Sequence, residues 1–293
     1  MTVRRVHTEH VQVAATLRRM REHAKVTREE AATLLGCTVS KIGDLETGRS
    51  RPKPVELERL LDHFGVVGDE RAELLRFART ARGRRAPSPY TAATVPNNHR
   101  RIVDLEAQAV SSLCYSGELV PGILQVPGYA KALLDWSWSG RPDEVAKLLD
   151  LRMERGKLLT RTHRPPLRYW CILGEGALRT IIGDRNTTRR QVEHLIELNT
   201  RSDNVIIQVM PFDGGPHAFR GMIATLHRFP PPAPDILLTD SYGRETIQDR
   251  PSVVEQATHH LDLMRGMALS REASTRIMRE TLDQLAESSS GSR

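Results

Sequence analysis

Three residues with different contact chemistry, Val39, Ser40 and Lys41, stand at the start of a segment with helical spacing. The hydroxyl of Thr38 can cap this segment, so we expect a helix over residues 39–47, ended by Gly48. A helix that presents such residues at its amino-terminal end can enter the major groove of duplex DNA while the helix before it crosses the backbone.

Two upstream helices must hold this segment in place. The first has apolar residues at helical spacing, at Val13, Leu17, Met20 and Ala24. The second begins after Thr27, whose hydroxyl can accept from the amide of Glu30 while the Glu30 carboxylate reaches back, and it ends at Gly36. A tight turn at residues 36–37 then leads into the third helix.

The reading segment also needs an apolar face toward a core. Ile42 and Leu45 share the face opposite the exposed residues, and we expect them to pack on Leu17, Leu34 and Leu60. Two further helices are predicted. The fourth begins after Pro52 and Pro54 and has apolar residues at Leu57, Leu60, Leu61 and Phe64. The fifth has apolar residues at Leu74, Leu75 and Ala78. Residues 1–81 are therefore predicted to form an all-α, five-helix domain.

The charge of the chain is concentrated in this region. Residues 1–85 carry 18 Lys and Arg against 12 Asp and Glu, whereas the remainder carries 25 against 24. This balance favours binding of a polyanion by the basic region, residues 1–85, rather than by the nearly neutral remainder. A solvated basic face without a ligand has the same balance, so charge alone leaves these two interpretations equal.

Four short runs carry a family resemblance: Thr27-Arg28-Glu29-Glu30-Ala31-Ala32, Leu35-Gly36, Ser40-Lys41-Ile42 and Leu45-Glu46-Thr47-Gly48-Arg49. Together they resemble the phage-repressor-type (XRE-like) helix-turn-helix domain. The resemblance implies phosphate contacts from three arginines, Arg28, Arg49 and Arg51. It also places Val39, Ser40 and Asp44 toward base edges and Lys41 near a phosphate or a guanine. For Asp44 the alternative is an ion pair with a neighbouring cation. For the whole region the alternative is a helical protein-interaction module without DNA contact.

Two positions depart from that family pattern. Ala31 stands where a leucine is usual, and Gly43 interrupts the recognition helix. Glycine inside a helix costs about 1 kcal/mol relative to alanine. We therefore expect either a less rigid reading helix or an unusually close approach of its backbone.

A second region begins after a segment with neither helical nor strand periodicity. Residues 82–99, rich in arginine, proline, serine and small residues, are predicted to be a linker. Beyond it, helices are expected at residues 101–109, 129–135 and 188–199, with another ending near Leu159. Strands are expected at residues 167–173, 204–210, 222–229 and 236–239. Two helices close the region, and Ser270 caps the second. Residues 100–287 are thus predicted to form an α+β domain with a mostly antiparallel sheet, followed by a disordered tail at residues 288–293.

Specific motifs occur in this second region. They are Leu119-Val120-Pro121-Gly122-Ile123-Leu124-Gln125, then Pro127, Tyr129 and Ala130, and later Val209-Met210-Pro211-Phe212 with Gly215, His217 and Gly221. They resemble WhiJ-like, antitoxin-like transcriptional regulators of filamentous soil bacteria. This resemblance implies developmental or antibiotic-related regulation and pairing with a small protein encoded by a neighbouring gene. Packing alone also explains the Pro-Gly turns.

The same region contains candidate residues for a small-molecule site. Tyr129, Trp136 and Trp170, with Trp138, could line an apolar pocket for a small effector, and His217 in a glycine-rich loop could serve a site. Core packing of the aromatic residues and an ordinary loop histidine are the alternatives. Nucleophile-elbow, phosphate-loop and zinc-helix motifs are missing from the sequence, so we expect no enzyme, cofactor or metal.

The cellular context follows from cysteines and hydropathy. Cys37, Cys114 and Cys171 lie far apart in sequence without metal-ligand spacing, so we expect reduced thiols. No apolar run is long enough for a bilayer. The hypothesis is a cytoplasmic, nucleoid-associated, repressor-like regulator that binds double-stranded DNA as a homodimer, with a C-terminal domain for a small partner protein or, alternatively, a small-molecule effector.

Overall fold

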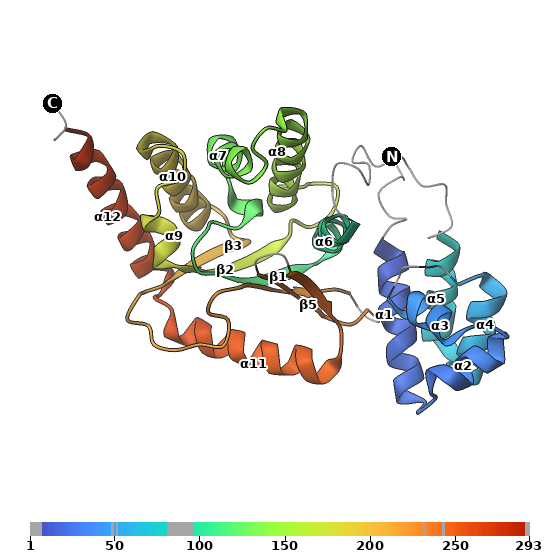
Figure 1. Ribbon diagram of the computed structural model, residues 1–293. Helices are drawn as coiled ribbons and strands as arrows, with labels where there is room; N and C mark the ends of the chain where they lie inside the picture. The colour runs from blue at the N-terminus through green and yellow to red at the C-terminus, as the bar shows by residue number, and fades with distance from the viewer. Residues whose placement is uncertain are drawn as a thin grey trace. The chain divides into compact units, whose positions relative to one another are not determined.

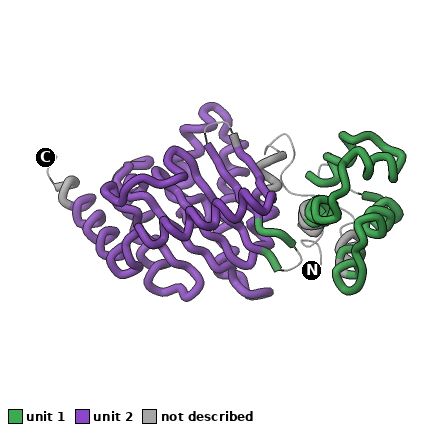
Figure 2. Tube along the Cα trace, turned by 90° about the horizontal axis from the view of Figure 1, so that it is seen from below, with its two compact units in different colours: residues 1–89, 229–235 green, residues 90–228, 236–293 purple. Residues whose placement is uncertain are grey.

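The chain divides into two compact units in a computed structural model that describes residues 8–47, 50, 52–80, 97–230, 233–241 and 244–290. Residues 1–89 with 229–235 form the N-terminal unit, and residues 90–228 with 236–293 form the C-terminal unit (Figure 2). Most of the predicted linker, residues 82–96, lies outside the described residues. Its last three residues are helical, because helix α6 (Asn97–Gln108) begins there.

The described part of the N-terminal unit contains the five predicted helices. They are α1 (Thr8–His23), α2 (Arg28–Leu35), α3 (Val39–Glu46), α4 (Pro54–His63) and α5 (Gly68–Thr80). The predicted caps at Thr27, Gly36 and Thr38 are confirmed, whereas Gly48, predicted to end the third helix, lies outside the described residues. Thr27 and Glu30 form the capping box of α2, and Gly36 ends that helix in the left-handed conformation at φ 63°. The Thr38 hydroxyl accepts from the amide of Lys41 at 3.2 Å. Helix α3 ends one residue earlier than predicted, with Thr47 as its C-cap.

The core of this unit explains how α3 is held. Ile42 and Leu45 are buried in one cluster with Leu17 and Leu60, as predicted, and Leu34 packs against it. Ala31, the departure from the family pattern, is fully buried in the same cluster. The apolar face of α3 is therefore fixed against α1, α2 and α4, which leaves its other face available for a partner.

The C-terminal unit is built on one sheet, and its predicted α+β class is confirmed. The strands are β1 (Ser111–Ser116), β2 (Arg168–Gly174), β3 (Val205–Met210), β4 (Ile223–Arg228), β5 (Ile236–Ser241) and β6 (Arg244–Gln248). Their order is β3-β2-β1-β4-β5-β6. The β1–β2 and β2–β3 pairs are parallel, whereas β1–β4, β4–β5 and β5–β6 are antiparallel. The sequence prediction missed β1 and β6.

Helices cover both faces of this sheet (Figure 1). On one side lie α6, α7 (Pro127–Ser137), α8 (Pro142–Gly156) and α10 (Arg185–Arg201); α9 (Glu175–Arg179) follows β2 directly. Helix α11 (Pro251–Met267) lies on the opposite side, and α12 (Arg271–Ser290) packs beside α10. Since α12 continues to Ser290, it includes the first three residues of the predicted disordered tail, whose last three lie outside the described residues.

The two sheet faces differ in polarity. Toward α11 the buried side chains are apolar, with Leu113, Ile172, Leu226 and Leu261 in one cluster. The other face carries a buried ion pair, in which Nε of Arg155 on α8 donates to Glu106 on α6 at 2.6 Å. Both side chains are largely removed from solvent. Burial of such a pair is tolerated only because each charge has its partner.

The Pro121-Gly122 motif has a packing role beside this ion pair. A Cβ atom on Gly122 would lie 3.1 Å from Nη1 of Arg155, so glycine leaves room for the guanidinium. A 3-10 helix follows (η1, Gly122–Leu124), and Gln125 then links Val120 to Arg152 through hydrogen bonds of 2.7 Å each. The motif that carries the second family resemblance is therefore a tightly packed structural element.

Candidate nucleic-acid interface

The exposed face of α3 presents the predicted reading residues. Val39 is 41 % exposed, and Ser40 is exposed beside it. Both lie at the amino-terminal end of the helix, and Ser40 points away from the side that buries Ile42 and Leu45. An exposed apolar group and a hydroxyl at this end can contact a thymine methyl group and the polar edges of bases in a major groove. The structure thus brings Val39 and Ser40 together on one accessible surface.

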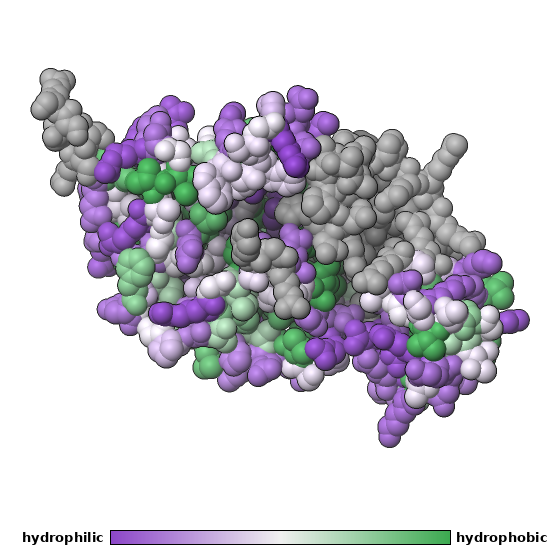
Figure 3. Space-filling view, in the orientation of Figure 1, coloured by the Kyte–Doolittle hydropathy of each residue, from purple (hydrophilic) through white to green (hydrophobic). Residues whose placement is uncertain are grey.

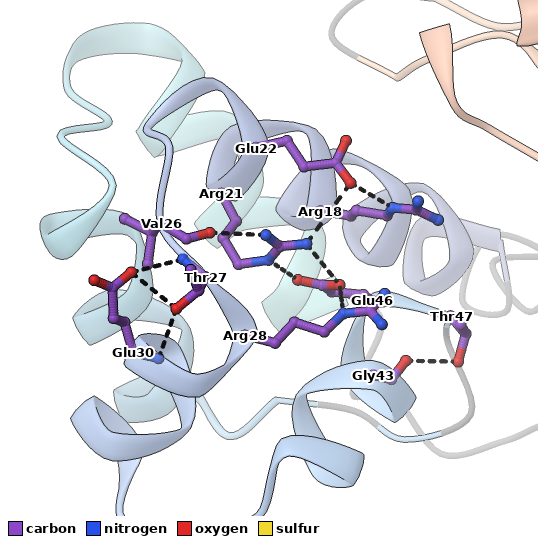
Figure 4. A network of polar contacts seen from close by, with 10 residues as sticks. All are labelled: Arg18, Arg21, Glu22, Val26, Thr27, Arg28, Glu30, Gly43, Glu46 and Thr47. Atoms are coloured by element: carbon purple, nitrogen blue, oxygen red, sulfur yellow. Dashed lines mark hydrogen bonds and ion pairs between the residues drawn. The ribbon is translucent and has the colours of Figure 1, made fainter. Parts of the chain in front are cut away.

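A buried carboxylate connects the three helices behind this surface (Figure 4). Glu46, at the end of α3, has a side chain that is only 1 % exposed and accepts from two arginines. Arg21 of α1 donates through Nε at 2.5 Å and also donates to the carbonyl of Val26 at 2.8 Å. Arg28, the first residue of α2, donates through Nε at 2.8 Å. One carboxylate therefore sets the position of two cationic side chains.

The Glu46 contact gives Arg28 a defined orientation. The Arg28 side chain is 38 % exposed and its Nε is held by Glu46. The terminal nitrogens of a guanidinium held in this way form a pair of donors suited to phosphate oxygens. The start of α2, where Arg28 lies, is also where backbone amides favour an anion. This orientation leaves the terminal nitrogens of Arg28 suited to a phosphate, and the contact itself stays a prediction.

Neither Glu46 nor Arg21 is among the predicted functional residues. Glu46 follows Leu45 and lies four positions after Ile42, so it occupies the buried face of α3. Arg21 lies four positions after Leu17 on the buried face of α1. A charged residue at a core-face position requires a buried partner. Two such residues of opposite charge were the signal that could have revealed the pair.

Lys41 has a partner within the chain rather than an open position. Its Nζ lies 2.6 Å from Oε1 of Glu56, near the start of α4. The hydrogen bond to Glu56 raises the pKa of Lys41. Burial raises the pKa of Glu56, but the bonds from Lys41 and from the amide of Lys53 outweigh it and the net shift is downward. The ion pair of Lys41 with Glu56 therefore links α3 to α4. To contact a phosphate or a guanine, the Lys41 ammonium must either bind it together with Glu56 or break the bond to Glu56.

The remaining predicted contacts are placed only in part. Asp44 is half-buried on α3, and its backbone carbonyl accepts from the amide of Ser50 at 3.0 Å. This bond holds Ser50 near the end of α3. Arg49 and Arg51, the other two predicted phosphate contacts, lie outside the described residues.

The four residues predicted for an effector site are not brought together. Tyr129 on α7 is fully buried, and its hydroxyl accepts from the amide of Val120 at 3.3 Å. Trp170 packs on the opposite sheet face, with Arg265 of α11 over its ring at 3.6 Å from the centroid. Trp136 is 84 % exposed. The ring of His217 meets Tyr115 edge-on, at 4.7 Å between centroids. These side chains therefore do not line one pocket.

Comparison with known families agrees with both units. Residues 12–74 match a helix-turn-helix domain, and residues 99–280 match a domain of unknown function, DUF5753. The second match covers more than half of the chain. The chain belongs to the DUF5753 family. No curated protein and no solved structure matches it.

The helix-turn-helix match and the arrangement of α2 and α3 identify a DNA-binding regulator of transcription. The DUF5753 domain, residues 99–280, falls within the C-terminal unit except for the segment 229–235. Among the described helices of this DUF5753 protein, none has both the length and the hydrophobicity that a membrane span requires.

Arg28 provides a direct test of the phosphate assignment. Replacing Arg28 with alanine is expected to weaken binding to all DNA sequences by about tenfold and to reduce the slope of log affinity against log salt by about one per DNA-binding unit. Titration of labelled duplexes at several salt concentrations measures both quantities. The matched control is Arg19→Ala, since Arg19 is an exposed arginine of α1 that pairs with Glu70 at 3.0 Å. Equal salt slopes for Arg28→Ala and the wild type would contradict the assignment.

Proposed function

We propose that this DUF5753 protein is a sequence-specific, antitoxin-like transcription regulator whose C-terminal unit binds a small partner protein. It acts in the cytoplasm on nucleoid DNA, and it regulates without catalysing a reaction. The observations that carry the DNA-binding part are Val39 and Ser40 at the exposed amino-terminal end of α3 and the guanidinium of Arg28, which Glu46 orients at the other end of that helix. The resemblance of the Leu119–Gln125 run to WhiJ-like regulators supports the partner.

The proposal includes a homodimer. A single helix-turn-helix reads too few base pairs for useful specificity, and a two-fold protein matches a two-fold operator. Half-sites separated by about 34 Å, one turn of the duplex, are therefore expected in DNA that the full chain selects from a random pool. Selected sequences with a single, unrepeated half-site would contradict the dimer.

An exposed apolar surface on the C-terminal unit supports a protein partner. Trp136 on α7 is 84 % exposed, and Ile181, between α9 and α10, is 40 % exposed. The loop after Ile181 packs on α7, since a Cβ atom on Gly183 would lie 3.0 Å from Cβ of Ala132, one turn before Trp136. Figure 3 shows hydrophobic surface on this unit beside α9 and α10. Exposed tryptophan is typical of residues that contribute most of the energy of an interface.

The partner proposal is tested by co-purification of the full chain with the product of the neighbouring gene. A complex is expected, and Trp136→Ala should weaken it by at least tenfold. Leu263→Ala is the matched control, because Leu263 is 53 % exposed on α11, on the opposite face of the sheet. Absence of a complex would refute the partner. Equal binding by the two variants would refute the Trp136 surface.

A small-molecule sensor is the second candidate, and His217 favours it. Its Nδ1 is buried and, among the described residues, has no hydrogen-bond partner. Burial, and then the charge of Arg220, lower the pKa of His217, which favours the neutral ring. A metabolite that raises the unfolding temperature and changes operator affinity is expected to lose both effects in His217→Ala. Unchanged effects in that variant would remove His217 from the site, and chemical conversion of the metabolite would indicate an enzyme instead.

A further inference from the structure

Gly43 lies in the middle of the exposed face of the reading helix. It follows Val39 by four residues and precedes Thr47 by four, so the three residues share one side of α3. Val39 and Thr47 carry side chains on that side, and Gly43 between them carries none. On this side of α3 the backbone is therefore uncovered at Gly43, between the side chains of Val39 and Thr47.

Nothing in the described fold requires a glycine at this position. A Cβ atom built on Gly43 would meet no described atom within 4 Å. Its backbone is that of an ordinary helix, because it is absent from the glycines with positive φ. Glycine is also a weaker helix former than alanine. The helix thus carries a destabilising residue that neither packing nor backbone conformation explains.

The chemistry around Gly43 indicates which group approaches it. The carbonyl oxygen of Gly43 already accepts twice from Thr47, from the amide at 3.0 Å and from the hydroxyl at 2.8 Å. The hydroxyl of Thr47 is engaged by the same bond, and Val39 is apolar. Because the carbonyl of Gly43 is engaged twice, a polar group that donates to it would have to displace a bond from Thr47, which favours an apolar group. The apolar group that projects into the major groove is the C5-methyl of thymine.

We propose that Gly43 is a specificity-determining residue whose bare backbone receives a thymine methyl group between Val39 and Thr47. The inference rests on the proposed function, since it requires α3 to lie in a major groove. It explains why this helix keeps a glycine: a Cβ atom would fill the space that the methyl group needs. The consequence is a preference for thymine at one position of each half-site, without a hydrogen bond to that base.

The test uses the full chain and a duplex that the wild-type protein selects from a randomised library. Gly43→Ala is expected to slow hydrogen exchange of the α3 amides about fivefold, because alanine stabilises the helix. The same variant is expected to bind the selected duplex at least tenfold more weakly. Replacing the critical thymine with deoxyuridine removes only the methyl group, and it should weaken wild-type binding about fivefold without weakening Gly43→Ala further.

Gly266→Ala is the matched control. Gly266 is also helical, on α11, and a Cβ atom there would meet no described atom within 4 Å. Its DNA affinity should equal that of the wild type. Wild-type or stronger affinity of Gly43→Ala would overturn the inference while leaving the proposed function intact. A loss of affinity that depends on no thymine methyl would also overturn it, and would place Gly43 against the sugar-phosphate backbone. Failure of the wild type to select any sequence would contradict the proposed function itself.

Discussion

Replacing Glu46 with glutamine is expected to destabilise the N-terminal unit by about 3 kcal/mol. Glutamine keeps the shape of the side chain but removes the charge that faces Arg21 and Arg28. Arg21 is nearly buried, and its guanidinium would keep only the longer contact of 3.7 Å with the exposed carboxylate of Glu22. Hydrogen exchange of the α1, α2 and α3 amides measures this loss as faster exchange across all three helices.

The control for Glu46 is an exposed carboxylate that pairs with an arginine in the same unit. Glu70→Gln removes the partner of Arg19, and both of those side chains are more than 40 % exposed. An exposed pair of this kind contributes at most about 1 kcal/mol. Equal destabilisation by the two variants would contradict the view that the buried carboxylate holds the three helices together. Because Glu46 also orients Arg28, the Glu46 variant should lose DNA affinity as well.

The C-terminal unit is expected to lose about 3 kcal/mol of stability as the pH falls from about 7 to about 4 through the titration of His227. Burial lowers the pKa of this histidine to about 4, with Glu106 opposing and Arg155 assisting the shift. Between the unfolded pKa of about 6.5 and the folded value, the unfolded chain binds a proton that the folded chain does not. Stability therefore falls with falling pH across that window and changes no further from this group below it.

His227→Asn isolates the contribution of His227 to the pH dependence. Nδ1 of His227 lies 2.7 Å from the Ser112 hydroxyl, and an asparagine amide can keep a hydrogen bond there without titrating. Urea unfolding of the wild type and the variant at several pH values gives the difference in stability. The difference should shrink steadily from pH 7 to pH 4. A gap that does not change with pH would show that His227 does not titrate in this range.

Much of the N-terminal unit could be predicted because its signals are local. The Thr27 capping box, the Gly36 turn and the Thr38 cap each involve residues within a few positions, and the structure contains all three. The exposure of Val39 and Ser40 could also be predicted, because it depends on their position in one helix. The Lys41–Glu56 pair could not be predicted in this way, because it depends on how α3 and α4 pack.

The C-terminal unit was harder to predict because its contacts join distant parts of the chain. Strand β1 is buried along nearly its whole length and rich in serine, so it lacks the alternation that marks a strand. Cys114 and Cys171, far apart in sequence, are register partners on β1 and β2, and both are free thiols. The aromatic residues predicted to line one pocket lie on different sides of the sheet. Cys114 and Cys171 become neighbours only because β1 and β2 pair in the sheet, and a sequence does not show which strands pair.

The salt dependence of DNA binding tests the central claim, that α3 reads duplex DNA while arginines beside it hold phosphates. In the proposed homodimer, the three predicted phosphate contacts, from Arg28, Arg49 and Arg51, would amount to six per complex, so a slope of about −5 in log affinity against log salt is expected. Affinity for a selected duplex should then fall roughly a thousandfold between about 50 and about 200 mM salt. Binding that is absent at low salt, or that is insensitive to salt, would contradict the account.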